Sequence, residues 1–372
     1  MGINVLSLFD GCSCGRVALE KLGIKVDKYY SSEIEKHAIA ITQHNFPDTI
    51  QLGDITKWRE WNIDFSTIDI LFAGFCCQSW SMSGKQLGDK DPRGKLMWDM
   101  LDILKHIRKL NPNIKFLFEN VRMKKEFKDY IDAAIGCEGI LINSALLSAQ
   151  NRNRNYWTNI PIKGLPEDKN IYLKDIIENN IDNSLYCINK DGTEKIKSNT
   201  IRTSSMGAGI DNKHNWDSIR IGQIGNGGQG QRIYSTEGKS VPLCALGGGQ
   251  GAKTGLYAIA QRGRNIVDGK RQDIYGAKTQ QRFETTYSEK CNTLTTVQKD
   301  SLLLDVRNGN YIIRKLTCIE CERLQTLYDN YTKYGNYNGV IKEVAKTNRY
   351  KALGNGWTVD VIVWILGFLK NS

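Results

Sequence analysis

The stretch that decides the fold is Ile3-Asn-Val-Leu-Ser-Leu-Phe-Asp-Gly-Cys-Ser-Cys-Gly15. Its first half is mostly apolar, which predicts a buried strand over Ile3–Phe9. A tight turn is expected over Asp10–Gly15, and a helix over Arg16–Leu22. Small residues in such a turn let the backbone approach a ligand closely, and the N-terminus of the next helix favours negative charge. The stretch therefore indicates a ligand-binding loop after a first strand.

The alternation of strand and helix continues through residues 1–160. Further strands are expected at Tyr29–Ser32, Ile68–Gly74 and Lys115–Phe118, and further helices at Glu33–His44 and Gly94–Leu110. This order predicts the α/β class, with a Rossmann-like, mostly parallel sheet covered by helices on both faces. Ligands of such sheets lie at the carboxyl ends of the strands.

Two further parts follow this first domain. Residues 161–313 lose the long helical periodicity, and positions 201–310 hold 17 of the 35 glycines. Three similar short segments there each read as a turn before a strand, which favours a smaller, β-rich inserted domain over a floppy surface insertion. Residues 314–372 become helical again, with helices expected over Arg314–Leu327 and Trp357–Leu369, and should pack into the first domain.

The composition is that of a soluble globular protein with an acidic partner. The 372 residues are 40% hydrophobic and 24% charged, and no apolar run approaches the roughly 18 residues that cross a membrane. Lys and Arg outnumber Asp and Glu by 51 to 40, which favours nucleic acid as the partner. Ten cysteines without a secretory signal suggest reduced thiols in the cytoplasm.

Two acidic residues follow the loop in chain order. Glu33 ends the second strand, where a carboxylate can accept hydrogen bonds from both hydroxyls of a ribose. Asp54 follows a further short apolar stretch. Either acid alone is as well explained by a helix cap or a surface charge. With the loop they favour an adenosine-containing cofactor. The absence of the G-x-G-x-x-G pattern argues against a nicotinamide dinucleotide as that cofactor.

Reactive side chains follow two other strands. Cys77 comes just after the strand that ends at Gly74, where it can be a nucleophile or an inert buried thiol. Glu119 ends the next strand, and a carboxylate there is costly unless it binds something. Arg152 and Arg154 lie at alternate positions, which on one continuous strand would put them, with Gln150, on a single face. A plain Arg–Glu ion pair remains an alternative.

These motifs, in this order, resemble the cytosine-5 DNA methyltransferases. The start, Leu6–Gly15, and the end, Gly354-Asn355-Gly356-Trp357-Thr-Val359, are similar to the family's first and last motifs. Both are close to those of the vertebrate de novo enzymes and of phage or bacterial relatives. Leu316–Gln325 matches the penultimate motif. The resemblance covers the first and third parts of the chain, and the middle part lies where the family has its target recognition domain.

The resemblance implies that S-adenosylmethionine is the cofactor and S-adenosylhomocysteine its product, on the fold of the S-adenosylmethionine-dependent methyltransferases. It implies that Glu33 holds the ribose and that Asp54 contacts the adenine. The other residues implied to line the cofactor site are Phe9, Asp10, Gly11, Gly15, Asn355 and Trp357.

The resemblance also implies a catalytic set. Cys77 is the implied nucleophile, which attacks carbon 6 of cytosine so that carbon 5 can accept a methyl group. Glu119 is implied to hydrogen-bond the ring nitrogen and the exocyclic amine. Arg152 and Arg154 are implied to stabilise charge at the base oxygen and to orient Glu119. The target cytosine must leave the base stack for this chemistry.

Two segments are expected to contact double-stranded DNA. The polar loop Ser79–Arg93 is hypothesised to close over the flipped base. The stretch Lys253–Arg282, with seven Lys or Arg and two Asp, would span phosphates and a groove, with a solvated face as the alternative. The residues expected near DNA are Trp80, Ser81, Lys85, Arg262, Arg264, Lys270 and Arg271.

The chain departs from the family at two cysteines. Cys76 stands where the family has a proline before the nucleophile, and the loss of a fixed φ predicts a looser loop. Cys318 also replaces a proline. Cys318 and Cys321 form a C-x-x-C without a second pair or a histidine cluster, so no metal site is expected.

The sequence thus predicts a DNA cytosine-5 methyltransferase, a monomer in the cytoplasm of a prokaryotic cell or phage-infected host, with no membrane partner. A DNA-binding relative impaired by Cys76 and an RNA cytosine-5 methyltransferase stay as alternatives. The sequence leaves open the recognised DNA site and whether a cognate restriction endonuclease acts separately.

Overall fold

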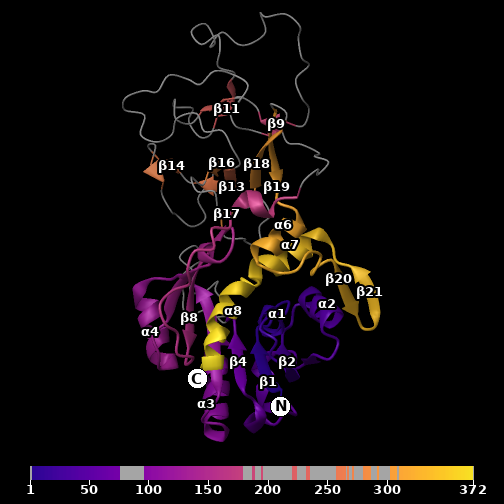
Figure 1. Ribbon diagram of the computed structural model, residues 1–372, viewed down its shortest axis with the longest axis vertical. Helices are drawn as coiled ribbons and strands as arrows, with labels where there is room; N and C mark the ends of the chain where they lie inside the picture. The colour runs from indigo at the N-terminus through magenta and orange to yellow at the C-terminus, as the bar shows by residue number, and fades with distance from the viewer. Residues whose placement is uncertain are drawn as a thin grey trace, which may run out of the picture. The chain divides into compact units, whose positions relative to one another are not determined.

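The computed structural model describes residues 2–75, 96–178 and 316–371, and between 187 and 315 the backbone of the strands alone. The chain divides into two compact units, each described here by itself (Figure 1). The first comprises Met1–Tyr172, Thr293–Thr296 and Cys318–Ser372, and the second Leu173–Asn292 and Val297–Thr317. Four predicted site residues lie outside the described part, namely Cys77, Trp80, Ser81 and Lys85. Cys76 and the loop Ser79–Arg93 also lie outside it.

A seven-stranded sheet forms the centre of the first unit, in the order β3-β2-β1-β4-β5-β8-β6. The five strands from β3 to β5 are parallel, and β8 runs antiparallel to both β5 and β6. The strands are β1 (Ile3–Leu8), β2 (Val26–Ser32), β3 (Ile50–Gln51), β4 (Ile70–Ala73), β5 (Lys115–Val121), β6 (Ile140–Asn143) and β8 (Asn153–Thr158). The predicted mostly parallel sheet is confirmed.

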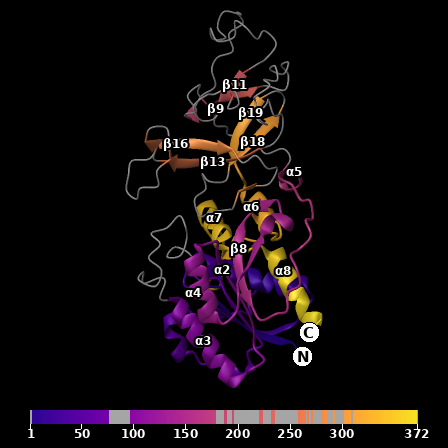
Figure 2. The same cartoon turned by 90° about the vertical axis from the view of Figure 1, so that its left-hand side faces the viewer.

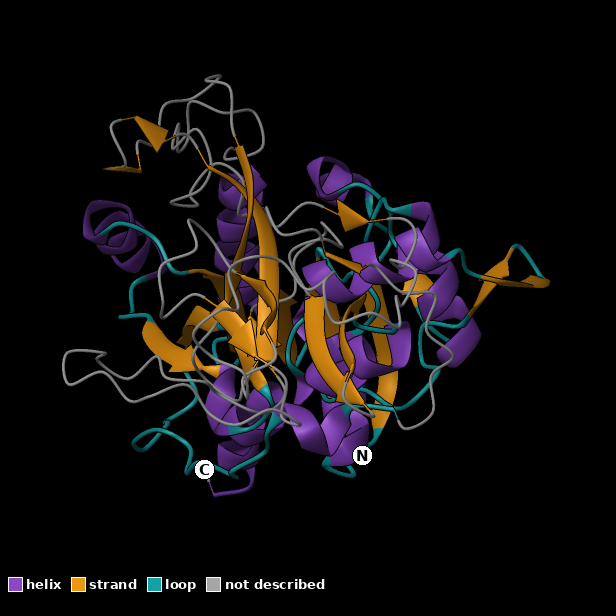
Figure 3. Ribbon diagram, turned by 90° about the horizontal axis from the view of Figure 1, so that it is seen from above, coloured by secondary structure: helices purple, strands orange, loops and turns teal. Residues whose placement is uncertain are grey.

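Helices cover both faces of this sheet (Figure 3). The helices of the first unit are α1 (Cys14–Lys21), α2 (Lys36–Asn45), α3 (Leu96–Leu110), α4 (Lys125–Ile135), α6 (Cys318–Leu324), α7 (Lys346–Asn355) and α8 (Val359–Gly367). Because both faces are covered, the central strand β4 is continuously apolar and all of it is buried. On one side α3 and α4 lie next to each other (Figure 2), and the rings of Trp98 and Tyr130 meet edge to face across them.

Short elements complete the first unit. They are the 3₁₀ helices η1 (Ile55–Glu60), η2 (Phe65–Thr67), η4 (Ser144–Leu146) and η8 (Phe368–Asn371), the two-residue strand β7 (Gln150–Asn151), and a hairpin of β20 (Tyr334–Tyr337) and β21 (Val340–Glu343). Within the described part of the chain, no helix has the length and apolar character needed to cross a membrane.

The second unit is β-rich, as the sequence predicts. Its main sheet is antiparallel, in the order β16-β13-β18-β19, and the other strands form small pairs. The elements are α5 (Leu173–Ile176), β9 (Cys187–Ile188), β10 (Glu194–Lys195), β11 (Arg220–Gln223), β12 (Arg232–Tyr234), β13 (Tyr257–Arg264), β14 (Ile266–Val267), β15 (Lys270–Arg271), β16 (Gln280–Thr285), β17 (Cys291–Asn292), β18 (Leu302–Arg307) and β19 (Asn310–Lys315).

The helix expected over Arg314–Leu327 is wrong at both ends. Arg314 and Lys315 belong to β19, where they pair with Leu303 and Leu302 of β18. The helix α6 begins only at Cys318 and ends at Leu324. The ladder hydrogen bonds to β18 therefore override the helical periodicity at the start of this segment.

A fully buried carboxylate joins α6 to α7. Glu322 accepts hydrogen bonds from the backbone N–H groups of Asn330 and Thr332, at 2.7 and 2.9 Å, and from the Thr332 hydroxyl at 2.5 Å. The Arg349 guanidinium completes the set at 2.9 Å and also donates to the Thr332 hydroxyl. A buried ion pair supplied with hydrogen bonds in this way becomes costly once one partner is removed.

We expect Glu322→Gln to lower the free energy of unfolding by about 3–5 kcal/mol, because Arg349 then keeps a buried charge without its counter-ion. Urea denaturation followed by circular dichroism measures this. The matched control is Glu343→Gln on the exposed strand β21, for which a change within about 0.5 kcal/mol is expected. Equal transition midpoints for the two variants would contradict the role given to Glu322.

Candidate active site

A cavity of about 420 Å³ lies at the carboxyl ends of β1, β2, β4 and β5. Residues of β8, of the start of α2, and of α7 with the segment after it complete its walls. The structure brings together here the predicted residues Phe9, Asp10, Gly11, Gly15, Glu33, Glu119, Arg152, Arg154, Asn355 and Trp357. The cavity therefore joins the two ends of the chain with the middle of the first domain.

The loop after β1 is held in place by Asp10. The partly buried Asp10 carboxylate accepts hydrogen bonds from the hydroxyls of Tyr29 at 2.8 Å, Ser31 at 3.0 Å and Ser13 at 2.5 Å. Burial raises the pKa of the Asp10 carboxyl, while these hydroxyls act in the opposite direction. The backbone of Phe9 is left-handed, with φ of 54°, a strained conformation for a bulky residue that is typical of functional sites.

Glu33 connects the end of β2 to this loop. One carboxylate oxygen accepts the Gly11 N–H at 2.8 Å, and the other accepts the N–H groups of Ile34 and Glu35 at 2.7 and 2.8 Å. Asp54 lies apart from the cavity lining. It is exposed and caps η1 by accepting the Thr56 N–H at 2.9 Å, so its contact with a ligand stays a prediction.

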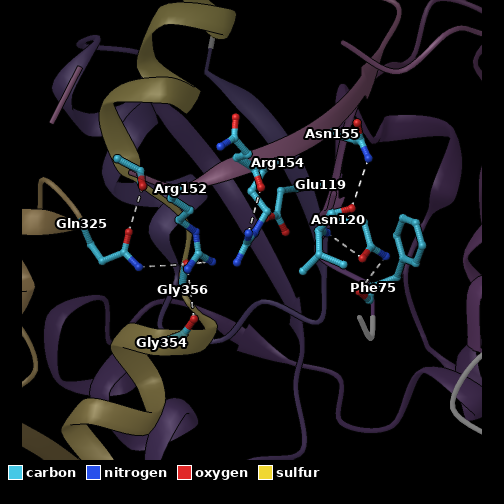
Figure 4. A network of polar contacts seen from close by, with 12 residues as sticks. Phe75, Glu119, Asn120, Arg152, Arg154, Asn155, Gln325, Gly354 and Gly356 are labelled. Carbon is cyan, nitrogen blue, oxygen red and sulfur yellow. Dashed lines mark hydrogen bonds and ion pairs between the residues drawn. The ribbon is translucent and has the colours of Figure 1, made fainter. Parts of the chain in front are cut away.

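Glu119 and Arg154 form an ion pair at one end of the cavity (Figure 4). Glu119 Oε1 lies 2.9 Å from Arg154 Nε but without hydrogen-bond geometry, and in the described part of the chain no donor hydrogen-bonds to this oxygen. Glu119 is only 7% exposed. This buried oxygen has an ion-pair partner but no hydrogen-bond donor among the described residues, which makes it a candidate to receive a ligand N–H.

Arg152 interrupts the strand that was expected to run from Gln150 to Arg154. Its own N–H donates to the Asn143 side chain at 3.0 Å and its carbonyl accepts the Ser144 N–H, so β7 and β8 are separate. The expectation of one continuous strand face is therefore wrong. The Arg152 guanidinium extends to the C-terminal segment, where it donates to the carbonyls of Gly356 at 2.9 Å and Gly354 at 3.3 Å.

Gln325 supports the same C-terminal segment from α6 (Figure 4). Its buried side chain donates to the carbonyl of Leu353 at 2.6 Å and, more weakly, to that of Gly356 at 3.3 Å. Its side-chain oxygen accepts the Thr358 hydroxyl at 2.9 Å. Arg152 and Gln325 together fix the backbone that carries Asn355 and Trp357.

Trp357 closes the cavity over β4. Its ring meets Phe72 edge to face, with centroids 6.1 Å apart, and is only 9% exposed. A Cβ atom at Gly74 would lie 2.8 Å from Trp357 Nε1, closer than real contacts allow. The glycine at the end of β4 is therefore what lets this ring approach the sheet.

Asn120 is a candidate site residue that the sequence analysis did not assign. It is buried, its side chain donates to the Phe75 carbonyl at 3.2 Å, and its side-chain oxygen accepts the Val121 N–H at 2.8 Å. Phe75 directly precedes Cys76, so Asn120 anchors the start of the cysteine segment. Its signal in the sequence is an amide at the end of an apolar strand, beside Glu119.

Among the described residues, no group of three or more His, Cys, Asp or Glu side chains is arranged to hold a metal ion. Cys318 and Cys321 are both buried, and neither is part of a disulfide. The side chains of the predicted DNA contacts Arg262, Arg264, Lys270 and Arg271 are not described, and only their backbone positions in β13 and β15 are known.

Comparison with known proteins points to one family. The model of the C-5 cytosine-specific DNA methylases matches residues 3–133 and 143–371. The type II methyltransferase M.HhaI of Haemophilus parahaemolyticus is 30% identical over 290 residues, which cover 71% of this chain and 81% of that protein. The orphan methyltransferase M.SPRI of Bacillus phage SPR is 24% identical over 97% of this chain and 95% of its own length.

Solved structures share the fold along the whole chain. The Dnmt2 methyltransferase of S. pombe has a TM-score of 0.55 at 14% identity, covering 100% of this chain and 99% of that one. A putative DNA modification methyltransferase from an E. coli prophage has a TM-score of 0.53 at 18% identity, with coverage of 100% and 99%. These likenesses establish the architecture.

We expect Gly74→Ala to destabilise the first unit by about 1–3 kcal/mol, because the added methyl group must displace the Trp357 ring. Urea denaturation of the variant measures the loss. The matched control is Gly367→Ala in α8, where the new methyl group meets open space and should be neutral or stabilising. If Trp357→Phe fails to relieve the cost of Gly74→Ala, the close approach is not its cause.

Proposed function

The chain belongs to the C-5 cytosine-specific DNA methylases, and on that premise we propose that it transfers the methyl group of S-adenosylmethionine to a cytosine flipped out of double-stranded DNA. Carbon 5 of the cytosine is the acceptor. The proposal rests on one observation. The Glu119–Arg154 ion pair lines the same cavity as the loop of Gly11 and the Glu33 carboxylate. A base and a nucleoside cofactor can meet there.

The described residues fit S-adenosylmethionine, which when bound supplies a methyl group on a positively charged sulfur and leaves as S-adenosylhomocysteine. The cavity volume lies within the range of roughly 300–1,000 Å³ that is typical of small-molecule sites. Glu33 offers a carboxylate for the ribose hydroxyls, and Trp357 an apolar wall. Phe9, Gly11 and Asn355 line the rest, and Asp54 is proposed for the adenine edge.

The proposed reaction begins at Cys77. Its thiolate bonds to carbon 6 of the cytosine, and the electron pair of the 5,6 double bond becomes available at carbon 5, which accepts the methyl group. Loss of the carbon-5 proton re-forms the double bond and expels the Cys77 thiolate. We propose Glu119 as the residue that hydrogen-bonds the ring nitrogen and the exocyclic amine, because its Oε1 is the oxygen without a donor among the described residues.

The two arginines support different parts of this site. Arg154 lies against the Glu119 carboxylate and orients it, and a contact with the base oxygen remains proposed for it. Arg152 is proposed as a positioning residue, since its guanidinium holds the carbonyls of Gly354 and Gly356. It thereby fixes the wall that carries Trp357.

We propose that the β-rich second unit is the target recognition domain and that the enzyme acts as a monomer. The unit supplies β13 with Arg262 and Arg264, and the two-residue strand β15 formed by Lys270 and Arg271. Cationic side chains on such strands can contact phosphates and base edges in a groove. The charge excess of the chain supports an acidic polymer as the partner.

Bisulfite sequencing of DNA from cells that express the protein tests the function. We expect methylated cytosines in one short sequence context, and none in cells that express Cys77→Ala at the same level. An adduct with fluorocytosine-containing duplex DNA, seen by mass spectrometry for the wild type alone, identifies the nucleophile. Unmodified DNA together with methylated RNA would overturn the DNA substrate.

Asn120→Ala should lower kcat about fivefold, because the Phe75 carbonyl loses a buried hydrogen bond of about 1 kcal/mol and the cysteine segment loses its anchor. The affinity for S-adenosylhomocysteine should stay within about twofold, which calorimetry measures. Asn155→Ala is the matched control, since Asn155 is also buried but donates to the Val121 carbonyl. A loss of cofactor affinity equal to the loss of rate would contradict this positioning role.

A further inference from the structure

The proposed function uses only Asn355 from one wall of the cavity. This wall is a face of α7, on which Asn348, Lys351, Ala352 and Asn355 follow one another at helical spacing and all line the cavity. Opposite it lies the N-terminus of α2, from which Glu35 and His37 line the cavity. The α7 wall is thus part of the ligand site and carries one cationic side chain.

That cation is Lys351, whose ammonium pairs with the Glu35 carboxylate. The two side chains are 47% and 35% exposed. The pairing lowers the pKa of the Glu35 carboxyl. Ion pairs this exposed to water contribute only about 0–1 kcal/mol. A ligand carboxylate that enters the cavity can therefore replace Glu35 as the partner at little cost.

The other cavity-lining side chains that can carry positive charge already form hydrogen bonds or an ion pair within the protein. Arg154 pairs with the buried Glu119, and Arg152 donates to two backbone carbonyls. His37 Nδ1 is hydrogen-bonded to the Tyr337 hydroxyl at 2.8 Å. Within the described lining, Lys351 is the cation whose partner is a half-exposed surface carboxylate.

The chemistry of the cofactor supplies an anion for it. The sulfonium sulfur carries a methyl group, an adenosyl group and an aminocarboxypropyl arm that ends in a carboxylate. The proposed function directs the methyl group toward Glu119 and the adenosyl group toward Glu33, whose charge repels a second carboxylate. The aminocarboxypropyl arm then faces the α7 wall, where Lys351 lies one helical turn before Asn355.

We propose that Lys351 is a cofactor-binding residue, which exchanges Glu35 for the carboxylate of the aminocarboxypropyl arm. This inference rests on the proposed cofactor. It makes Lys351 a determinant of selectivity between amino-acid nucleosides and nucleosides without that arm.

Calorimetry with two ligands tests the assignment. One ligand is S-adenosylhomocysteine, and the other is 5′-methylthioadenosine, which retains the adenosyl thioether but lacks the carboxylate. Lys351→Met keeps the apolar stem and removes the charge. We expect it to weaken S-adenosylhomocysteine about three- to fivefold, the size of a partly exposed ion pair, and to leave methylthioadenosine unchanged. Lys351→Arg should restore the difference between the two ligands.

Two further variants serve as controls. Lys346→Met removes an exposed lysine of the same helix that does not line the cavity, and should change neither affinity. Glu35→Gln removes the competing carboxylate, and should leave S-adenosylhomocysteine binding equal or tighter. Thermal unfolding of each variant verifies that the fold is retained.

Each other outcome overturns the assignment. An equal loss for both ligands in Lys351→Met would mean that the lysine only supports the shape of the cavity. An unchanged affinity for S-adenosylhomocysteine would mean that Lys351 makes no contact with the arm. Failure of the wild-type protein to bind either nucleoside would instead overturn the proposed cofactor, which separates the two hypotheses.

Discussion

The structure depends on the burial of parallel strands on both faces. β4 is apolar throughout, and β1 and β5 are apolar at most of their buried positions, because helices cover the sheet on either side. Such strands can carry ligand-binding polar groups only where they end. Asp10, Glu33 and Glu119 all stand at or just beyond a strand end, and parallel pairing brings those ends to one edge. The position of the site is thus a consequence of the core.

The C-terminal segment is held at this edge of the sheet by hydrogen bonds to its backbone carbonyl groups. Buried carbonyl groups require donors, and the carbonyls of Leu353, Gly354 and Gly356 receive theirs from Gln325 and Arg152. The Glu322–Arg349 pair holds α6 and α7 together one layer away. The hydrogen bonds that stabilise the last helices therefore also fix the wall of the cavity.

Periodicity and chain order predict the strands, the helices and most lining residues, since these depend on local sequence. Contacts between distant segments escape such reasoning. The direction of the Arg152 side chain follows from two glycine carbonyls some 200 positions later, and the pairing of Lys351 with Glu35 joins α7 to α2. The helix assigned to Arg314 fails for the same reason, because its partner strand β18 is what decides its structure.

The same distinction bears on Cys76, which stands where the resembling family has a proline. A proline restrains its own φ, whereas the residue before it can be restrained by a hydrogen bond from a neighbouring strand. Asn120 does so here by binding the Phe75 carbonyl, and is itself fixed through the Val121 N–H. Glu119, next to Asn120 on β5, keeps its pairing with Arg154. The neighbouring strand β5 thus restrains Phe75, the last described residue before Cys76, through a side chain rather than through a ring in the chain itself.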